Sequence, residues 1–334
     1  MPKQRNPYFD TMKYVLIALV VFGHTLASRK HASINHPLYV TMLLFKMPLF
    51  IFISGYFSKV KERHSYFQGL IKIFETFLVF HIIGVIIAVL KGEAFSLQLI
   101  LTPAWPYWYL LCLVFWRLML YFIDIRKNNW NPIMVLAVSV LLAISAGFVP
   151  INKVFEFQRT FTFLPFFVVG VYASKYQYAF TETPSTSLRL FASLLLLFVF
   201  AVAFVIEIPQ DELFLGRTSY YYLEVPVMTG CIYRIIHLVM AVLMGLCVMA
   251  LIPHKQTMAS KLGQETLFVY VYHTFFVLAL RSAIRNLHFP SNTISMVVYA
   301  ILILVALHFL YKVNFLQYML NPITNYRKTK KKEE

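Results

Sequence analysis

Three ionisable residues frame the first apolar run of the chain, and their side chains suit proton transfer and anion binding. Asp10 and Lys13 stand at its start and His24 stands at its end, with only uncharged residues between Lys13 and His24. An imidazole titrates near neutrality, which makes it a good acceptor for a hydroxyl proton. A lysine binds phosphate as a point charge. The pattern predicts a base deep in the run and charged groups at its entrance.

Helical geometry places these residues on one stripe. With 100° and 1.5 Å per residue, Asp10 and His24 are about 40° apart in azimuth and roughly 21 Å apart in height. Lys13 and His24 are about 20° apart in azimuth. A hydrogen-bonded acid–base dyad within this helix is therefore excluded. The stripe instead predicts the wall of a passage.

Other polar side chains fall within apolar runs, where ionisable groups usually face the bundle interior and mark function. Lys46 lies too deep for its ammonium to reach the surface, so we expect it to contact substrate or a partner. Glu75 and Arg117 fall at similar depth, and pairing would give them a structural role. His81, His237 and His308 are expected to hydrogen-bond neighbouring helices. The remaining candidates are Trp105, Trp108, Tyr109, Tyr272 and His273, of which the two tryptophans also suit an interfacial belt.

The composition indicates where these residues sit. The chain is 60% hydrophobic and only 13% charged, which is typical of an all-α, polytopic membrane protein. The net charge of +16 is better explained by lysines and arginines that flank membrane spans than by nucleic-acid binding. Cys112, Cys231 and Cys247 have no metal-binding or disulfide spacing. We therefore expect no nucleic-acid partner and no metal.

The apolar runs predict about ten transmembrane helices in one integral-membrane domain over residues 1–334. Ten spans put both termini on one side, and the excess of lysine and arginine on that side predicts that it is the cytoplasm. The predicted spans are 12–28, 38–58, 70–90, 106–123, 131–148, 160–176, 188–208, 232–252, 265–285 and 293–313.

The first run also has features of a cleavable signal peptide. Lys3, Arg5 and Lys13 suit a positive n-region, and small residues follow His24. Asp10 is awkward in such a region. Cleavage would also leave nine spans and place the basic tail outside, against the charge bias. A short, retained first span is the better interpretation.

Several stretches, in order, resemble the acyltransferase-3 family of membrane proteins, nearest to its fucose 4-O-acetylase-like branch. The first stretch is Arg5, then Asp10, then Lys13, then an apolar run that ends in Gly23-His24. The resemblance covers nearly the whole chain. The other stretches are "KMPLFIFISGYF" at 46–57, "WYLLCLVFWRL" at 108–118 and "TLFVYVYHTFF" at 266–276.

The resemblance implies an O-acyltransferase of the bacterial inner membrane. Such enzymes move an acyl group, usually acetyl, from cytoplasmic acyl-CoA to a hydroxyl of a surface or lipid-linked carbohydrate, so acyl-CoA is a substrate and no cofactor is bound permanently. The family's essential histidine falls on His24 and its acidic residue on Asp10. The family's basic residues fall on Arg5, Lys13 and Arg117, which would hold the CoA phosphates. The acceptor side would be lined by Lys46, Trp105, Trp108, Tyr109, Tyr272 and His273.

Some points stay open at the level of sequence. The family often has a histidine where Lys46 stands, and this lysine would suit an anionic acyl group such as succinyl. His24 is expected to act as a base, with an acyl-histidine relay as the alternative. Lys46 or Tyr272 would donate to the oxyanion. The rival functions are a polysaccharide exporter or flippase and a non-catalytic subunit of a glycan synthase complex.

Overall fold

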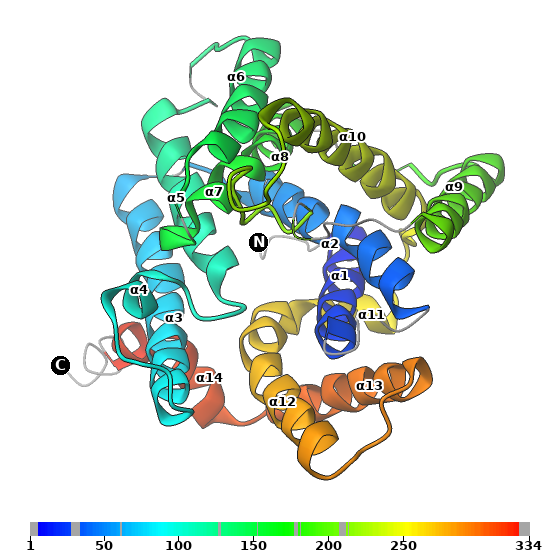
Figure 1. The fold of residues 1–334 in the computed structure, drawn as a ribbon. Coiled ribbons are helices and arrows are strands. Elements are labelled where there is room, and N and C mark those ends of the chain that lie inside the picture. The colour runs from blue at the N-terminus through cyan, green and yellow to red at the C-terminus, as the bar shows by residue number, and fades with distance from the viewer. Residues whose placement is uncertain are drawn as a thin grey trace. The chain divides into compact units, whose positions relative to one another are not determined.

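The computed structural model describes residues 6–27, 34–60, 62–125, 128–151, 153–176, 180, 182–206, 212 and 214–326. Arg5, one of the expected phosphate-binding residues, lies outside these ranges. The described elements are all helical (Figure 1). They are α1 (Pro7–Leu26), α2 (Asn35–Phe57), α3 (Arg63–Leu90), α4 (Leu97–Leu101), α5 (Trp108–Ile123), α6 (Pro132–Ser145), η2 (Ala146–Phe148), η3 (Val154–Glu156), α7 (Phe157–Thr162), α8 (Leu164–Lys175), α9 (Thr186–Val205), α10 (Val227–Leu251), α11 (Met258–Leu262), η5 (Gly263–Glu265), α12 (Thr266–Asn286), α13 (Thr293–Leu310) and α14 (Asn314–Leu320).

The protein is an all-α, polytopic integral membrane protein. Among the described residues, seven helices are long and apolar enough to cross a bilayer. An eighth candidate is the segment predicted as one span over 160–176, which is bent by 55° between Thr162 and Leu164. Pro165, early in α8, cannot donate a backbone hydrogen bond to the preceding turn, which explains a break there. The helices in the predicted spans 106–123 and 131–148 are Trp108–Ile123 and Pro132–Phe148. Both are shorter than a normal span, so the count of ten stays a prediction.

The chain forms two compact units. Unit 1 comprises Met1–Phe50, Tyr178–Phe214 and Ile235–Leu310. Unit 2 comprises Ile51–Gln177, Leu215–Arg234 and Tyr311–Glu334. The expected site residues are divided between them. His24, Asp10, Lys13, Lys46, Tyr272 and His273 belong to unit 1, whereas Trp105, Trp108, Tyr109 and Arg117 belong to unit 2.

Helix α1 is the centre of unit 1. It begins at Pro7, five residues earlier than predicted, because the Asn6 side chain accepts a hydrogen bond from the Tyr8 amide and proline suits the first helical position. Its sides pack against α11, α12 and α13 (Figure 1). Leu16, Ile17 and Val21 are fully buried in these contacts. The first apolar run is therefore packed on several sides within unit 1.

Unit 2 contains α3 packed on α5 and α6 packed on α8 (Figure 1). The C-terminal half of α2 lies against α8 through two glycines. A Cβ atom at Gly55 would collide with the carbonyl of Phe167, and one at Gly170 would collide with the carbonyl of Phe52. Small residues of this kind let membrane helices approach backbone to backbone.

Candidate functional site

Two histidines meet at the C-terminal end of α1. The rings of His24 on α1 and His273 on α12 are stacked, with centroids 5.3 Å apart and planes 13° from parallel. His24 is half-buried, whereas His273 is fully buried. The two residues are far apart in sequence, so the packing of α12 against α1 creates the pair. An imidazole that is both accessible and held by a buried neighbour is a suitable base.

The hydrogen bonds of His273 determine which ring nitrogen has the proton. Its Nδ1 lies 3.0 Å from the carbonyl oxygen of Val269. A carbonyl can only accept, so Nδ1 is the donor, and in the neutral ring Nε2 presents a lone pair. Nε2 has no hydrogen-bond partner among the described residues. A buried acceptor without a donor is costly, which marks this atom as a place for a hydroxyl or water.

The ammonium of Lys46 lies beside this pair. Lys46, on α2, is 3% exposed, and its Nζ occupies the space that a Cβ atom on Gly23 would need. Nζ is also 5.5 Å from the ring centroid of Tyr39. Gly23 therefore lets a positive charge approach the backbone immediately before His24.

A second basic residue fixes the end of α1. Arg281 of α12 donates a hydrogen bond from a terminal guanidinium nitrogen to the backbone carbonyl of His24, at 3.3 Å. The carbonyls of a last helical turn lack partners within the helix, and a guanidinium satisfies them well. The contact ties the position of His24 to the same helix that holds His273.

The other end of α1 holds the predicted charged entrance. The Nζ atom of Lys13 is 2.5 Å from a carboxylate oxygen of Asp10, and the Lys13 side chain remains 26% exposed. A Cβ atom on Gly263 would collide with the backbone carbonyl of Asp10, so α1 and η5 approach closely there. Because α1 is continuous from Pro7 to Leu26, Asp10 and His24 stay about 21 Å apart, in agreement with the sequence argument.

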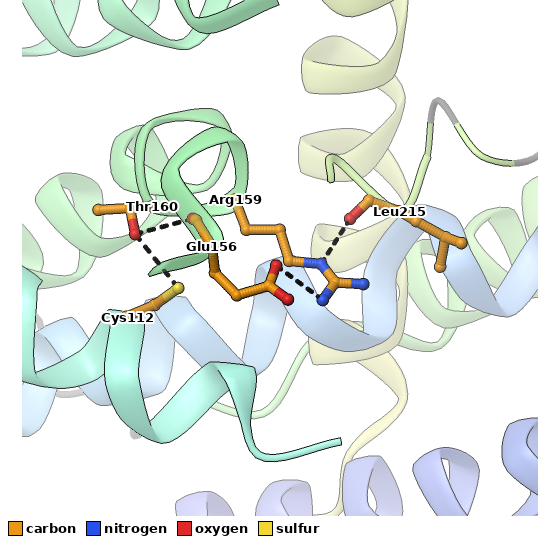
Figure 2. Close-up of polar contacts among 5 residues, drawn as sticks. All are labelled: Cys112, Glu156, Arg159, Thr160 and Leu215. Atoms are coloured by element: carbon orange, nitrogen blue, oxygen red, sulfur yellow. Dashed lines mark hydrogen bonds and ion pairs between the residues drawn. The ribbon is translucent and has the colours of Figure 1, made fainter. Parts of the chain in front are cut away.

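Unit 2 contains a buried ionic cluster that sequence reasoning missed (Figure 2). A guanidinium nitrogen of Arg159 is 2.9 Å from the Glu156 carboxylate, and its Nε donates to the carbonyl of Leu215 at 3.1 Å. The Arg159 guanidinium also lies 4.3 Å from the ring centroid of Trp108. The Thr160 hydroxyl lies 3.1 Å from the Glu156 carbonyl oxygen and 3.3 Å from the Cys112 sulfur, which connects α5 to this cluster. The spacing Glu-x-x-Arg just before an apolar run was the available signal.

The backbone that leads into this cluster is strained. Lys153, Phe155 and Glu156 have φ angles of 58°, 49° and 53°, in the left-handed region that favours glycine. Such conformations persist only where the surroundings enforce them. Here the buried Glu156–Arg159 ion pair supplies part of that enforcement, because both side chains are less than a tenth exposed.

The aromatic residues expected on the acceptor side are mostly packed in the protein. Trp108 is buried against Phe163 as well as Arg159, so little of its ring is available for a sugar. Tyr109 shares a 2.5 Å hydrogen bond with Ser54. Tyr272 lies among the rings of its own helix. Trp105 is half-buried and keeps more exposed surface than Trp108.

The expected pairing of Glu75 with Arg117 is wrong. The Glu75 carboxylate accepts hydrogen bonds from the amides of Ile323 and Thr324 and from the Thr324 hydroxyl. It thereby caps a helical turn near the C-terminus, whose first amides have no partner within the turn. Arg117 instead places its guanidinium 4.9 Å from the ring centroid of Tyr66. A contact between segments some 250 residues apart could not be read from depth alone.

Two of the isolated histidines have the structural role that was predicted. His81 Nε2 donates to the carbonyl of Ile100 at 2.8 Å, and its Nδ1 accepts from the amide of Ala104 at 3.0 Å. His308 Nδ1 lies 3.0 Å from the Glu265 carboxylate. His237 packs edge-on against Phe214.

Tyr220, in the loop before α10, is buried and not exposed to solvent. Its hydroxyl donates to the carbonyl of Ile144, and its ring fills space left by Gly147 and Gly230. Burial raises the pKa of the Tyr220 phenol, while Arg234 opposes that rise. The neighbouring Tyr221 is exposed, so only part of this aromatic loop can meet a ligand.

Comparison with known proteins identifies the family. The profile of the acyltransferase-3 family, described as an acyltransferase domain, matches residues 6–311. No curated protein and no solved structure matches the chain. The match includes the histidine pair, Lys46 and both ends of α1. The chain therefore belongs to the acyltransferase-3 family and is a membrane acyltransferase.

Proposed function

We propose that the protein is an O-acyltransferase of the bacterial inner membrane with both termini in the cytoplasm. It transfers an acyl group, by default acetyl, from cytoplasmic acyl-CoA to a hydroxyl of a surface or lipid-linked carbohydrate. The observation that supports this reaction best is the stacked pair of His24 and His273 beside the Lys46 ammonium. It brings together a base, a buried hydrogen-bond acceptor and a cation at the C-terminal end of α1.

In this proposal His24 is the general base. It accepts the proton of the acceptor hydroxyl as the oxygen attacks the thioester carbon. The tetrahedral intermediate then collapses, the carbon–sulfur bond breaks, and the CoA sulfur leaves with the proton that His24 returns. The intermediate places negative charge on the former carbonyl oxygen. Lys46 and Tyr272 are the two expected oxyanion donors. The Lys46 ammonium lies against Gly23, next to His24, whereas Tyr272 contacts the Phe268 ring, so Lys46 is the better candidate.

Lys13 and Arg5 are proposed to hold the CoA phosphates. The partial exposure of Lys13 at the far end of α1 supports this role, because a phosphate can approach it from water. The thioester arm is long and thin enough to extend along α1 from there. Asp10 would then orient Lys13 through their ion pair rather than act on His24 directly.

The test is the substitution His24→Ala in cells that depend on this protein for glycan acylation. Removal of a general base is expected to lower acyl transfer by about 10²- to 10⁴-fold. Mass spectrometry of the glycans measures acylation, and binding of radiolabelled acyl-CoA to the purified protein shows that the fold is kept. The matched control is His64→Ala, because His64 is exposed and its hydrogen bond among the described residues is to Gln68 of its own helix.

Full acylation with His24→Ala would overturn the mechanism. The alternative function, a polysaccharide exporter, predicts a different result. In that case the wild-type protein would not bind acyl-CoA, and an unacylated glycan would still reach the surface.

A further inference from the structure

Lys46 is a buried cation whose counter-charge is not supplied by the described chain. Its side chain is 3% exposed, and no described aspartate or glutamate forms an ion pair with it. The acidic residues on the helices of unit 1 are already engaged, Asp10 with Lys13 and Glu265 with His308. Keeping an unpaired ammonium away from water is expensive, so such a lysine either loses its proton or is neutralised by a bound anion.

A second observation points to a ligand at the same place. His273 Nε2 is buried without a hydrogen-bond partner among the described residues. The His273 ring stacks on His24, and the Lys46 ammonium lies against Gly23, the residue before His24. Among the described residues, Lys46 thus lacks an ion-pair partner and His273 Nε2 lacks a hydrogen-bond partner, and the two lie on different helices near His24. A wholly apolar substrate would satisfy neither of them. A ligand with an anionic group and a hydroxyl would satisfy both.

We propose that Lys46 binds a carboxylate of the substrate and so selects anionic substrates. This inference rests on the proposed acyl transfer and names its substrate class. The oxyanion of the reaction exists only for an instant, whereas a bound carboxylate would keep the buried amine protonated and neutralise its charge throughout binding. The carboxylate belongs either to the acyl group, as in a dicarboxylic acid linked to CoA, or to an acidic sugar in the acceptor.

Three substitutions separate charge from shape. Lys46→Met keeps most of the side-chain stem and removes the charge. Lys46→Arg keeps a charge. Gly23→Ala keeps Lys46 but introduces a Cβ atom where the ammonium lies, and the flexible end of the lysine must move away. The matched control is Gly245→Ala, because a Cβ atom at Gly245 meets nothing within 4 Å.

The first experiment compares transfer by the purified protein with two donors, succinyl-CoA and acetyl-CoA, and two acceptors, a glucuronate-containing and a glucose-only oligosaccharide. The wild type is expected to prefer the anionic member of one pair. The pair that shows the preference identifies the source of the carboxylate. Lys46→Met and Gly23→Ala are expected to lower kcat/KM for that anionic substrate by about 10- to 100-fold, the range for loss of a charge-assisted contact. In the same variants the ratio of kcat/KM for the anionic substrate to kcat/KM for the neutral substrate should fall by about tenfold or more. Lys46→Arg should keep most of the preference.

An equal loss with neutral and anionic substrates overturns the proposal and leaves Lys46 as an oxyanion donor only. A wild type without preference in either pair also overturns it.

The second experiment does not depend on turnover. Thermal stability of the wild type and of Lys46→Met is measured with millimolar succinyl-CoA against acetyl-CoA, and with methyl glucuronide against methyl glucoside. Stabilisation of the wild type alone by an anionic probe supports carboxylate binding even if no acyl transfer occurs, in which case the proposed function fails separately. The absence of any charge-dependent difference contradicts carboxylate binding.

Discussion

The ring of His24 lies 5.3 Å, centroid to centroid, from the ring of His273, and the two planes are nearly parallel. The pair joins a half-buried imidazole, which a substrate can reach, to a fully buried one, which the protein holds through Val269. The stack restricts the orientation of His24. Such restriction matters for a base, because proton transfer depends on alignment.

The stack gives a first prediction. His273→Ala is expected to lower kcat for acyl transfer by at least about tenfold, because the His24 ring loses its support. His273→Phe restores a flat ring without nitrogens and should recover part of kcat if stacking is what matters. Steady-state kinetics of the purified variants provide the measurement, with His64→Ala as the control. Unchanged kcat for His273→Ala would show that the pair has no part in catalysis.

The contact between α2 and α8 gives a second prediction, on stability. Gly55→Ala and Gly170→Ala each place a Cβ atom against a backbone carbonyl, which cannot move aside as a side chain can. We expect each to lower the melting temperature clearly, since overpacking typically costs about 1–3 kcal/mol. Gly245→Ala, in open space within α10, should be neutral or slightly stabilising, because alanine favours helix. Equal melting temperatures for all three variants would argue against the close approach of α2 and α8.

The ionic cluster in Figure 2 gives a third prediction. Glu156→Gln or Arg159→Met removes one partner of a buried pair and strands the other, which costs about 3–5 kcal/mol. The double variant should be less destabilised than the sum of the two, because neither charge is left alone. Thermal unfolding in detergent measures the cycle, and the exposed Glu93→Gln is the control. Strict additivity would mean that the two side chains do not interact.

The cap on the C-terminal turn gives a fourth prediction. Glu75→Ala removes the acceptor of the Ile323 and Thr324 amides, so these amides should exchange with solvent faster. Hydrogen–deuterium exchange of the peptide over 321–326 measures the effect. Glu93→Ala should leave that peptide unchanged. Unaltered exchange with Glu75→Ala would show that other contacts hold the turn.

The structure also shows which sequence arguments were sound. The order of the apolar runs was predictable because a membrane helix satisfies its backbone hydrogen bonds locally, so composition and length suffice. Every predicted span overlaps helical structure, but the span 160–176 falls on two helices, α7 and α8, and the bend between them was not predicted. The proline at position 165 was its only local signal, and the angle depends on what each half packs against.

The candidate site was predictable only in part. Sequence reasoning named Lys46 and His273 individually but could not place them beside His24. Glu156 and Arg159 were missed because their importance comes from burial, which depends on the surrounding helices. The pairing of Glu75 with Arg117 failed for the same reason, since depth in the membrane does not define the direction in which a side chain points.

The sequence by itself determined the helical class, the continuity of the first helix and the separation of Asp10 from His24. These follow from local backbone geometry, which is the same in any α-helix. Only the tertiary structure decided that Gly23 makes room for the Lys46 ammonium and that His273 stacks on His24. Those contacts join helices distant in the chain, and side-chain packing over many residues, rather than any local pattern, selects them.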